Sequence, residues 1–477
     1  MIDRRKSRVR IGLWAGPVLG FVVWVALGAA DAGLEEPGRR TAAVAVWMAV
    51  WWMTEAIPIY ATGLLPLAVF PLLGVADMRA ASVPYGHPLI YLFLGGFLIA
   101  LAIERAGLHV RMARRAVRAV GTRPDRIMGA FLVTSAGLSM WVSNTATAMV
   151  MTPIALSLVA GERQDAESPF ACGLLLCVAY GCSIGGVGTL IGTPPNLFLA
   201  SFAEQSLGHT ISFAAWLAAA LPLVVILGIA AWVLVARVLF RCTAVELSAT
   251  AGDAPPFSRA ERRVAVVFTL TALAWITRPV LAGIEVAGGK PLSGLTDPGI
   301  AVIAALVLFV LPGGDGRRLL HWSDTRRLPW GILVLFGGGL SLAAAMDGNG
   351  VSEYLGTALA GAAALPLAVL VLCVCALMVF LTEVTSNTAT TAAMVPVFAA
   401  IAQGAGLPPM LLAVPAAVAA SCAFMLPVAT PPNAIVFGSG RLPMAAMVRA
   451  GFWLNLLSIV LITAWTLTLG QALVSAP

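Results

Sequence analysis

The word Ser-Asn-Thr-Ala-Thr occurs twice in this sequence, at residues 143–147 and, 243 positions later, at residues 386–390. Each copy lies between apolar runs. Its hydroxyl and amide groups donate and accept hydrogen bonds, and their oxygen atoms are the ligands that a hard cation such as sodium prefers. The repetition predicts two half-sites, built by a duplicated unit, that meet in one binding site.

A second word, Thr-Pro-Pro-Asn, follows each copy, at residues 193–196 and 430–433. Two consecutive prolines cannot continue a helix, so each apolar span that contains this word should be broken within the membrane. A break exposes N–H groups at the N-terminus of one half-helix and carbonyl groups at the C-terminus of the other. The N–H groups suit a carboxylate and the carbonyl groups suit a cation.

Other functions fit these words less well. A single Ser-Asn-Thr word could serve helix packing alone, but two copies, each followed by a break, favour a binding site. An enzyme would need a nucleophile, a base or a metal cluster, and no His or Cys accompanies the words. A channel is disfavoured because paired breaks suit an occluded site better than an open pore.

Glu383 is an intramembrane carboxylate that lies three residues before Ser386. Such a group is a functional candidate by default, and here it could couple transport to protons. The alternative is a hydrogen-bonded structural group that braces the hairpin. We favour the structural interpretation.

The composition is that of an all-α polytopic membrane protein. Of 477 residues, 60% are hydrophobic and only 11% are charged, and apolar stretches long enough to cross the hydrocarbon core recur along the chain. The net charge of +7 is interpreted through topology and contact with anionic membrane lipid, and no basic, aromatic patch predicts a nucleic-acid partner. The seven cysteines lie mostly in apolar runs without metal-ligand spacing, which is typical of core residues.

About 11 transmembrane helices are predicted, with two re-entrant hairpins and two broken helices in an inverted-topology repeat. The hairpin arms are too short for a comfortable crossing, so each hairpin should enter and leave on one side. The predicted segments are an N-terminal cytoplasmic tail, first span and outer loop at 1–40; repeat 1 at 41–240, with its hairpin at 127–160 and broken helix at 169–203; a cytoplasmic linker at 241–263; and repeat 2 at 264–477, with its hairpin at 366–402, broken helix at 409–438 and a last span.

Charge indicates that the two repeats have opposite orientations. Residues 105–126 carry seven arginines, whereas the equivalent residues 350–370 contain no lysine or arginine. By the positive-inside rule the first segment lies in the cytoplasm and the second outside. We therefore expect inverted repeats, a cytoplasmic N-terminus, an external C-terminus and hairpin tips that meet near the membrane midplane.

Together these words resemble the signatures of the divalent anion/sodium symporter family. Residues 51–58 and 183–189 are similar to two further signatures of that family, and the resemblance runs from about residue 41 to residue 453. It implies a homodimer in the cytoplasmic (plasma) membrane, with eleven spans in each protomer. It also implies a transport region that moves as a rigid elevator against a scaffold.

The resemblance assigns three groups of residues by position. The first sodium site would use Ser139, Ser143, Asn144 and Gly192. The second sodium site would use Thr382, Thr385, Asn387 and Ala429. The substrate carboxylates would be held by Ser143, Asn144, Thr145, Ser386, Asn387, Thr388, Thr430 and Pro431.

The function expected from these observations is secondary active transport, in which sodium drives the import of a C4-dicarboxylate such as succinate, malate or fumarate. Two alternatives stay open within this class: a sodium-independent dicarboxylate exchanger, and a sodium-coupled citrate or sulfate transporter. No enzymatic activity is expected.

Overall fold

Helices and the loops that join them make up the part of the protein that the structure describes. The computed structural model describes residues 2–30, 33–118, 123–159, 168–242, 256–285, 289–314, 316–358 and 365–474. No β-strand occurs in these ranges. Most of the predicted cytoplasmic linker, residues 243–255, lies outside the described residues.

The helices before the linker include those predicted for repeat 1. They are α1 (Ile2–Ala29), α2 (Glu36–Thr54), α3 (Ile59–Thr62), α4 (Leu65–Leu73), α5 (Met78–Ser82), α6 (Pro88–Ala106), α7 (Leu108–Arg118), α8 (Pro124–Ser139), α9 (Asn144–Leu158), α10 (Pro169–Gly186), α11 (Pro194–Leu207) and α12 (Phe213–Trp232). A short 3₁₀ helix follows α5, and a π-helical turn extends α12 to Leu239.

The helices after the linker follow the same order of long spans, hairpin and broken helix. They are α13 (Arg259–Ala282), α14 (Asp297–Val310), α15 (Trp330–Gly348), α16 (Val351–Ala358), α17 (Leu367–Thr382), α18 (Asn387–Gly404), α19 (Met410–Ala420), α20 (Pro431–Gly438), α21 (Met444–Thr466) and α22 (Gln471–Val474). The interruptions predicted at the two Thr-Pro-Pro-Asn words separate α10 from α11 and α19 from α20.

The helices have the length and composition of membrane spans. Among the described residues, seven helical stretches are long and apolar enough to cross a membrane, and four shorter apolar helices accompany them. The prediction of an all-α polytopic membrane protein is therefore confirmed. The number of eleven crossings stays a prediction.

Two local features could not be read from the apolar runs. The apolar stretch around residues 61–75 does not form one continuous helix: it contains the end of α3 and all of α4, because Pro66 in the first turn of α4 lacks the amide that a continuous helix needs. Helix α16, which no apolar run predicts, follows Gly350 at φ +75°. Its counterpart α7 follows Gly107 at φ +74°, so both turns use the left-handed conformation that glycine adopts readily.

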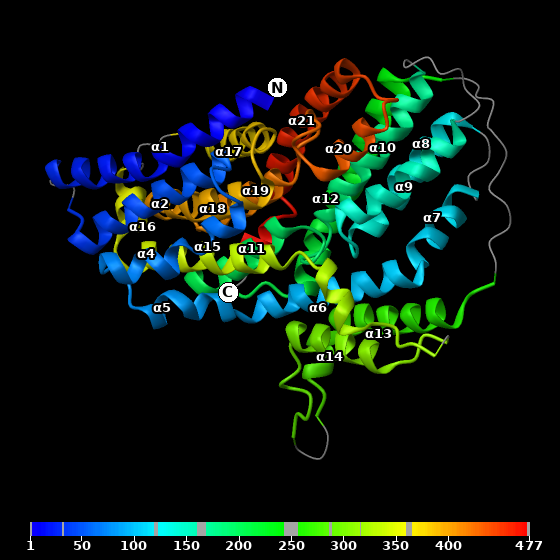
Figure 1. Ribbon diagram of the computed structural model, residues 1–477, viewed down its shortest axis with the longest axis horizontal. Coiled ribbons are helices and arrows are strands. Elements are labelled where there is room, and N and C mark those ends of the chain that lie inside the picture. The colour runs from blue at the N-terminus through cyan, green and yellow to red at the C-terminus, as the bar shows by residue number, and fades with distance from the viewer. Residues whose placement is uncertain are drawn as a thin grey trace.

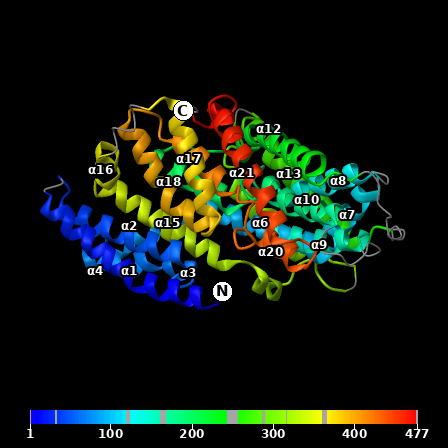
Figure 2. The ribbon, with the colours of Figure 1, turned by 90° about the horizontal axis from the view of Figure 1, so that it is seen from above.

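The predicted repeats are intertwined in space. Helices α2 and α4 lie with α16 and α18 at one end of the long axis, whereas α7, α8 and α9 lie with α13 at the other (Figures 1 and 2). Helix α2 packs directly against α18, and α13 contacts α6 and α7. Helix α2 of predicted repeat 1 thus lies beside the hairpin of repeat 2, and α13 of predicted repeat 2 lies beside α6 and α7 of repeat 1.

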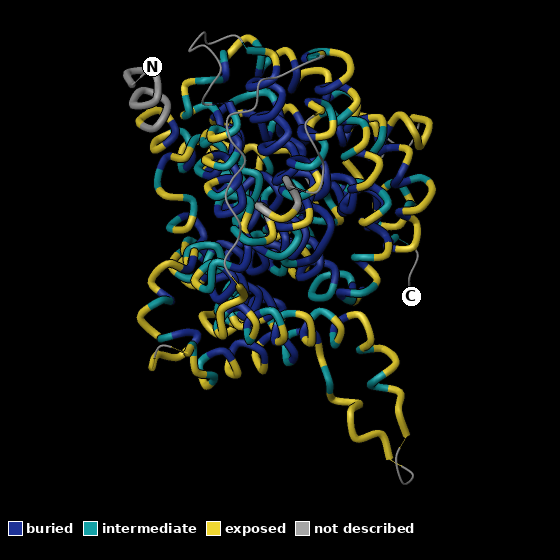
Figure 3. Tube along the Cα trace, turned by 90° about the vertical axis from the view of Figure 1, so that its right-hand side faces the viewer, coloured by how far each residue is buried: buried dark blue, intermediate teal, exposed yellow. Residues whose placement is uncertain are grey.

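Burial separates an interior from an apolar periphery (Figure 3). Every residue of α10 from Phe170 to Gly186 is buried, and so is all of α19. Helices α1 and α13 instead expose large apolar side chains such as Trp14 and Val280, at 73% and 71%. A periphery of this kind suits contact with lipid, and it leaves α10 and α19 as the buried core around the breaks.

Candidate functional site

The first hairpin places its polar word at a helix N-terminus. Helix α8 ends at Ser139, and Ser143 caps α9 by accepting a 3.2 Å hydrogen bond from the amide of Ala146. Across the turn, the Ser139 hydroxyl donates to Asn144 Oδ1 at 2.5 Å. Two side-chain oxygens that the resemblance assigns to one cation site are therefore in direct contact.

The second hairpin repeats this geometry. Helix α17 ends at Thr382, whose hydroxyl donates to Asn387 Oδ1 at 2.6 Å, again five residues along the chain. Thr385 turns its hydroxyl toward its own hairpin, where it donates to the Leu381 carbonyl at 2.7 Å and lies 2.6 Å from the Thr390 hydroxyl. The repeated sequence word therefore forms the same hydroxyl–asparagine hydrogen bond in both hairpins.

The last residue of each Thr-Pro-Pro-Asn word holds its break in shape. Asn196 is fully buried, and its Nδ2 donates to three carbonyls of the first break, those of Gly186, Val187 and Thr189, at 3.1, 3.1 and 2.8 Å. Asn433 Nδ2 donates in the same way to the carbonyls of Ala423 and Leu426 at 3.3 and 3.0 Å. These asparagines satisfy backbone groups that the helix interruption leaves without intrahelical partners.

Helix packing joins the two halves of the candidate site. Helix α9 packs against α20, and α18 packs against α11, so the second helix of each hairpin lies beside the break of the other predicted repeat. Helix α10 contacts both α9 and α20. Helices α9, α11, α18 and α20 begin at the repeated words, and the positive ends of their dipoles favour an anion.

Glu383 anchors the second hairpin to its own break. Its carboxylate is 1% exposed and accepts hydrogen bonds from the amides of Phe424, Met425 and Leu426 at 2.7, 2.8 and 2.9 Å. Asn455 Nδ2 on α21 donates to the same carboxylate at 2.8 Å. Four N–H donors around one carboxylate support the favoured interpretation of Glu383 as a structural brace.

The predicted site residues divide by exposure. Ser143 and Pro431 are exposed. Five others are partly exposed, namely Asn144, Thr145, Ser386, Asn387 and Thr388. The buried ones are Ser139, Gly192, Thr382, Thr385, Ala429 and Thr430. The substrate assignments thus fall mainly on accessible residues, and the sodium assignments fall largely on buried ones.

The residues of the first predicted sodium site fit a small hard cation. All the donors are oxygens, and none is a thiol or an imidazole. The packing leaves no room for larger side chains: a Cβ at Gly192 would lie 2.4 Å from the Gly186 carbonyl oxygen, and one at Gly186 would lie 2.8 Å from Asn144 Oδ1. Gly186 of the first break therefore lies directly against the Asn144 side chain of the hairpin tip, where a larger residue would not fit.

Three asparagines of this region have structural roles that the sequence did not assign. Asn196 and Asn433 are the last residues of the two Thr-Pro-Pro-Asn words, so the motif already contained both of them. Asn455 is fully buried in the apolar helix α21, as are Ser458 and Thr466. No pattern marks it, because its partner Glu383 lies 72 residues away in the sequence.

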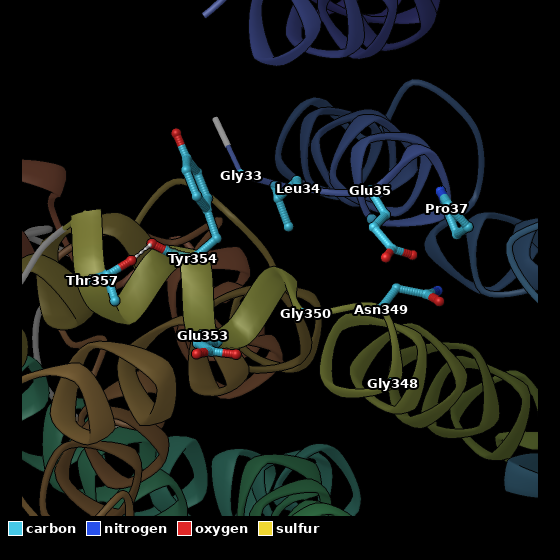
Figure 4. Close-up of a pocket in the computed structure, with 11 residues that line it drawn as sticks. Gly33, Leu34, Glu35, Pro37, Gly348, Asn349, Gly350, Glu353, Tyr354 and Thr357 are labelled. Atoms are coloured by element: carbon cyan, nitrogen blue, oxygen red, sulfur yellow. Dashed lines mark hydrogen bonds between the residues drawn. The ribbon is translucent and has the colours of Figure 1, made fainter. Parts of the chain in front are cut away.

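A cavity of about 490 Å³ lies away from the hairpin tips, between the α1–α2 connection and the α15–α16 corner (Figure 4). Glu35 and Asn349 point toward one another across it, and Glu353 and Tyr354 also line it. The lining contains two carboxylates and no lysine or arginine. Because like charges repel, this cavity is a poor site for a dianion, and the hairpin tips remain the candidate site.

Paired hairpins, paired helix breaks and an oxygen-rich centre within an apolar helical fold define a membrane carrier. Residues 14–476 match the family described as the sodium:sulfate symporter transmembrane region. The chain belongs to this family of divalent anion/sodium symporters, whose members are transporters and not enzymes.

Curated relatives agree with this membership. The sodium-dependent dicarboxylate transporter SdcS of Staphylococcus saprophyticus is 39% identical over 470 residues, which cover 95% of this chain and 89% of that protein. The protein of the same name from Staphylococcus aureus is 38% identical with the same coverage.

Two solved structures share the fold at low sequence identity. The YdaH transporter of Alcanivorax borkumensis has a TM-score of 0.55 and 17% identity, over 85% of this chain and 88% of that one. MtrF of Neisseria gonorrhoeae has a TM-score of 0.59 and 14% identity, over 91% and 96% of the two chains. At these identities the likeness supports the fold alone.

Proposed function

We propose that this protein is a secondary active transporter that imports C4-dicarboxylates, such as succinate, malate or fumarate, together with sodium ions. The observation that carries the proposal is the matched pair of hairpin tips, each with a hydroxyl–asparagine contact and each packed beside the break of the other repeat. The printed names of the relatives, sodium-dependent dicarboxylate transporters at 38–39% identity, support the same function.

In this proposal each hairpin tip holds one of the two substrate carboxylates. Ser143, Asn144 and Thr145 contribute one set of donors, and the equivalent residues 386–388 contribute the other. Thr430 and Pro431 stand at the start of α20, where the helix dipole favours a carboxylate. The two sets of donors explain why a dicarboxylate suits the site better than a monocarboxylate.

Sodium ions supply the positive charge that the hairpins lack. The only charged residue in either predicted hairpin, at 127–160 or 366–402, is the acidic Glu383. A dianion at membrane depth is costly unless its charge is compensated. Ser139 with Asn144, and Thr382 with Asn387, would hold cations behind the substrate, and ordering of the tips by those cations would couple the two ligands.

The transport cycle proposed here is an elevator-type alternation of access. Hairpins and broken helices would move as one unit relative to a scaffold formed by other helices, within a homodimer in the plasma membrane. Sequence asymmetry supports a cytoplasmic N-terminus and an external C-terminus, since arginines gather at 105–126 and are absent from 350–370.

A competition panel in proteoliposomes tests the proposed function. Uptake of labelled succinate would be measured against unlabelled malate, citrate, sulfate and 2-oxoglutarate, with sodium and with potassium in its place. Sodium-dependent uptake that malate inhibits more strongly than citrate or sulfate is the expected result. Uptake that is unchanged in potassium, without a proton gradient, would refute sodium coupling, and trans-stimulation by internal succinate would then identify an exchanger.

Sulfate is the second candidate substrate, because the matched family is described as sodium:sulfate symporters. Sulfate is a compact dianion that one hairpin tip could hold alone. Strong inhibition of succinate uptake by sulfate, together with direct sodium-driven sulfate uptake, would favour this alternative.

A further inference from the structure

The tip of the first hairpin carries a tryptophan that lies within an aromatic cluster. The Trp141 indole stacks on Phe213 at 5.8 Å between ring centroids, meets Phe268 edge-on at 5.0 Å and lies nearly parallel to Trp275 at 6.5 Å. Phe213 and Trp275 also stack on each other at 4.5 Å. We call Trp141, Phe213, Phe268 and Trp275 the aromatic clasp.

Polar contacts fix the clasp at the start of α14. Asp297 accepts a 2.8 Å hydrogen bond from the Phe213 amide and forms a 2.7 Å ion pair with Arg278. The Trp275 indole N–H donates to the Asp297 carbonyl oxygen at 3.0 Å. Phe213 and Trp275 are 0% and 1% exposed, so Trp141 docks against a surface held by buried partners.

Trp141 stands inside the turn that carries the proposed first sodium site. Ser139 lies two residues before it and Ser143 two residues after it. Its backbone amide donates to the Leu138 carbonyl at 3.0 Å, and the neighbouring Met140 carbonyl accepts from the Thr189 hydroxyl of the first break. A fixed indole therefore fixes the residues on both sides of it.

The second hairpin has a different anchor at the equivalent positions. Met140 and Trp141 correspond to Glu383 and Val384, 243 residues later. Glu383 ties its tip to amides of its own repeat, whereas the side chain of Val384 is 51% exposed. The first tip is instead held by rings on α13, a helix of the other repeat.

We propose that Trp141 is a positioning residue for the first half-site: by docking in the aromatic clasp it holds Ser139, Ser143 and Asn144 in the geometry that binds sodium and substrate. The proposal rests on the transport function proposed above. In the conformation of this structure it makes the affinity of the first half-site depend on contact with α13, whereas the second half-site depends on Glu383.

Three single variants test this role in proteoliposomes and in detergent. For Trp141→Ala we expect at least a fivefold rise in both the KM for succinate and the sodium concentration at half-maximal uptake, with kcat within threefold of the parent value. Trp141→Phe keeps a stacking ring and should restore both constants to within twofold. Trp453→Ala removes an exposed tryptophan of α21 and serves as the matched control.

Binding supplies a readout that does not require transport. Sodium raises the unfolding temperature of a protein whose folded state binds it, so the sodium concentration needed for half of that rise should shift at least fivefold in Trp141→Ala and stay unchanged in the Trp453→Ala control. A lower unfolding temperature with unaltered sodium affinity and unaltered KM would overturn the positioning role. Absence of sodium-dependent uptake in the parent protein would instead overturn the proposed function. Sodium affinity from thermal unfolding would still test Trp141 in that case: an affinity in Trp141→Ala equal to that of the parent would refute the positioning role.

Discussion

At the scale of single residues, the asparagines of the hairpin tips have the same environment although 243 positions separate them. Asn144 Oδ1 accepts from Ser139 and Asn387 Oδ1 accepts from Thr382, at 2.5 and 2.6 Å. Each amide is therefore oriented by a buried hydroxyl, which leaves its remaining hydrogen-bonding groups for ligands. An oriented ligand group of this kind loses less freedom when the ligand binds.

Removal of either amide should abolish transport. We expect Asn144→Ala and Asn387→Ala each to reduce sodium-driven succinate uptake by more than about tenfold, since loss of an oriented ligand group weakens cation sites by that order. Gln403→Ala, an exposed amide at the end of α18, is the matched control and should transport normally. Full activity in either asparagine variant would refute a site built from both hairpins.

Substitution of Glu383 distinguishes a structural role of this carboxylate from a role in proton coupling. In Glu383→Gln one carboxylate oxygen becomes an NH₂ group that faces backbone N–H donors, so we expect the free energy of unfolding to fall by about 1–3 kcal/mol. Thermal unfolding in detergent measures the loss. The remaining folded protein should keep its sodium dependence; uptake that turns from proton-driven to proton-independent in this variant would restore the coupling interpretation.

At the scale of elements, the two broken helices are built around close backbone contact. A Cβ at Gly185 of α10 would lie 2.2 Å from the Ala136 carbonyl oxygen of α8, so the first hairpin rests directly on the helix before the break. Small residues allow such an approach between membrane helices. This packing joins the first hairpin directly to the helix that precedes the break.

Gly185→Ala should therefore be destabilising. The added methyl group meets backbone atoms that cannot rotate away, and overpacking of this kind costs about 1–3 kcal/mol in the free energy of unfolding. Gly137→Ala on α8 is the matched control, because a Cβ there meets nothing within 4 Å. Equal unfolding temperatures for the two variants in the same detergent would show that α8 and α10 do not pack as described.

The sequence predicted these elements unevenly, for physical reasons. Proline pairs and polar words mark chain breaks locally, so the hairpins, the breaks and most long helices could be predicted. Helix α16 could not, because it is only eight residues long and depends on contact with α18, where Gly356 meets Gly404. The aromatic clasp and the Asn455–Glu383 bond also escaped prediction, since each joins segments distant in the chain.

At the scale of the whole molecule, the intertwined repeats place each hairpin beside helices of the other half. In the proposed function this arrangement would let a polar word from each repeat contribute to one site, and such a site would require the two halves to have opposite orientations in the membrane. The arginine-rich segment that contains α7 and the segment without lysine or arginine that contains α16 are the sequence features that indicate this inversion.

Cysteine labelling across the membrane tests the inversion. Arg115 on α7 and Thr357 on α16 are both exposed and lie at nearly equivalent positions of the two repeats. In a variant without the seven native cysteines, Thr357→Cys should react with an impermeant maleimide added outside intact cells, and Arg115→Cys should react only in inside-out vesicles. The positive-inside rule gives this sign, because the arginines flanking Arg115 retain its segment in the cytoplasm. Labelling of both cysteines from one side would mean parallel repeats, and the two tips would then enter from the same face and could not form the shared site proposed here.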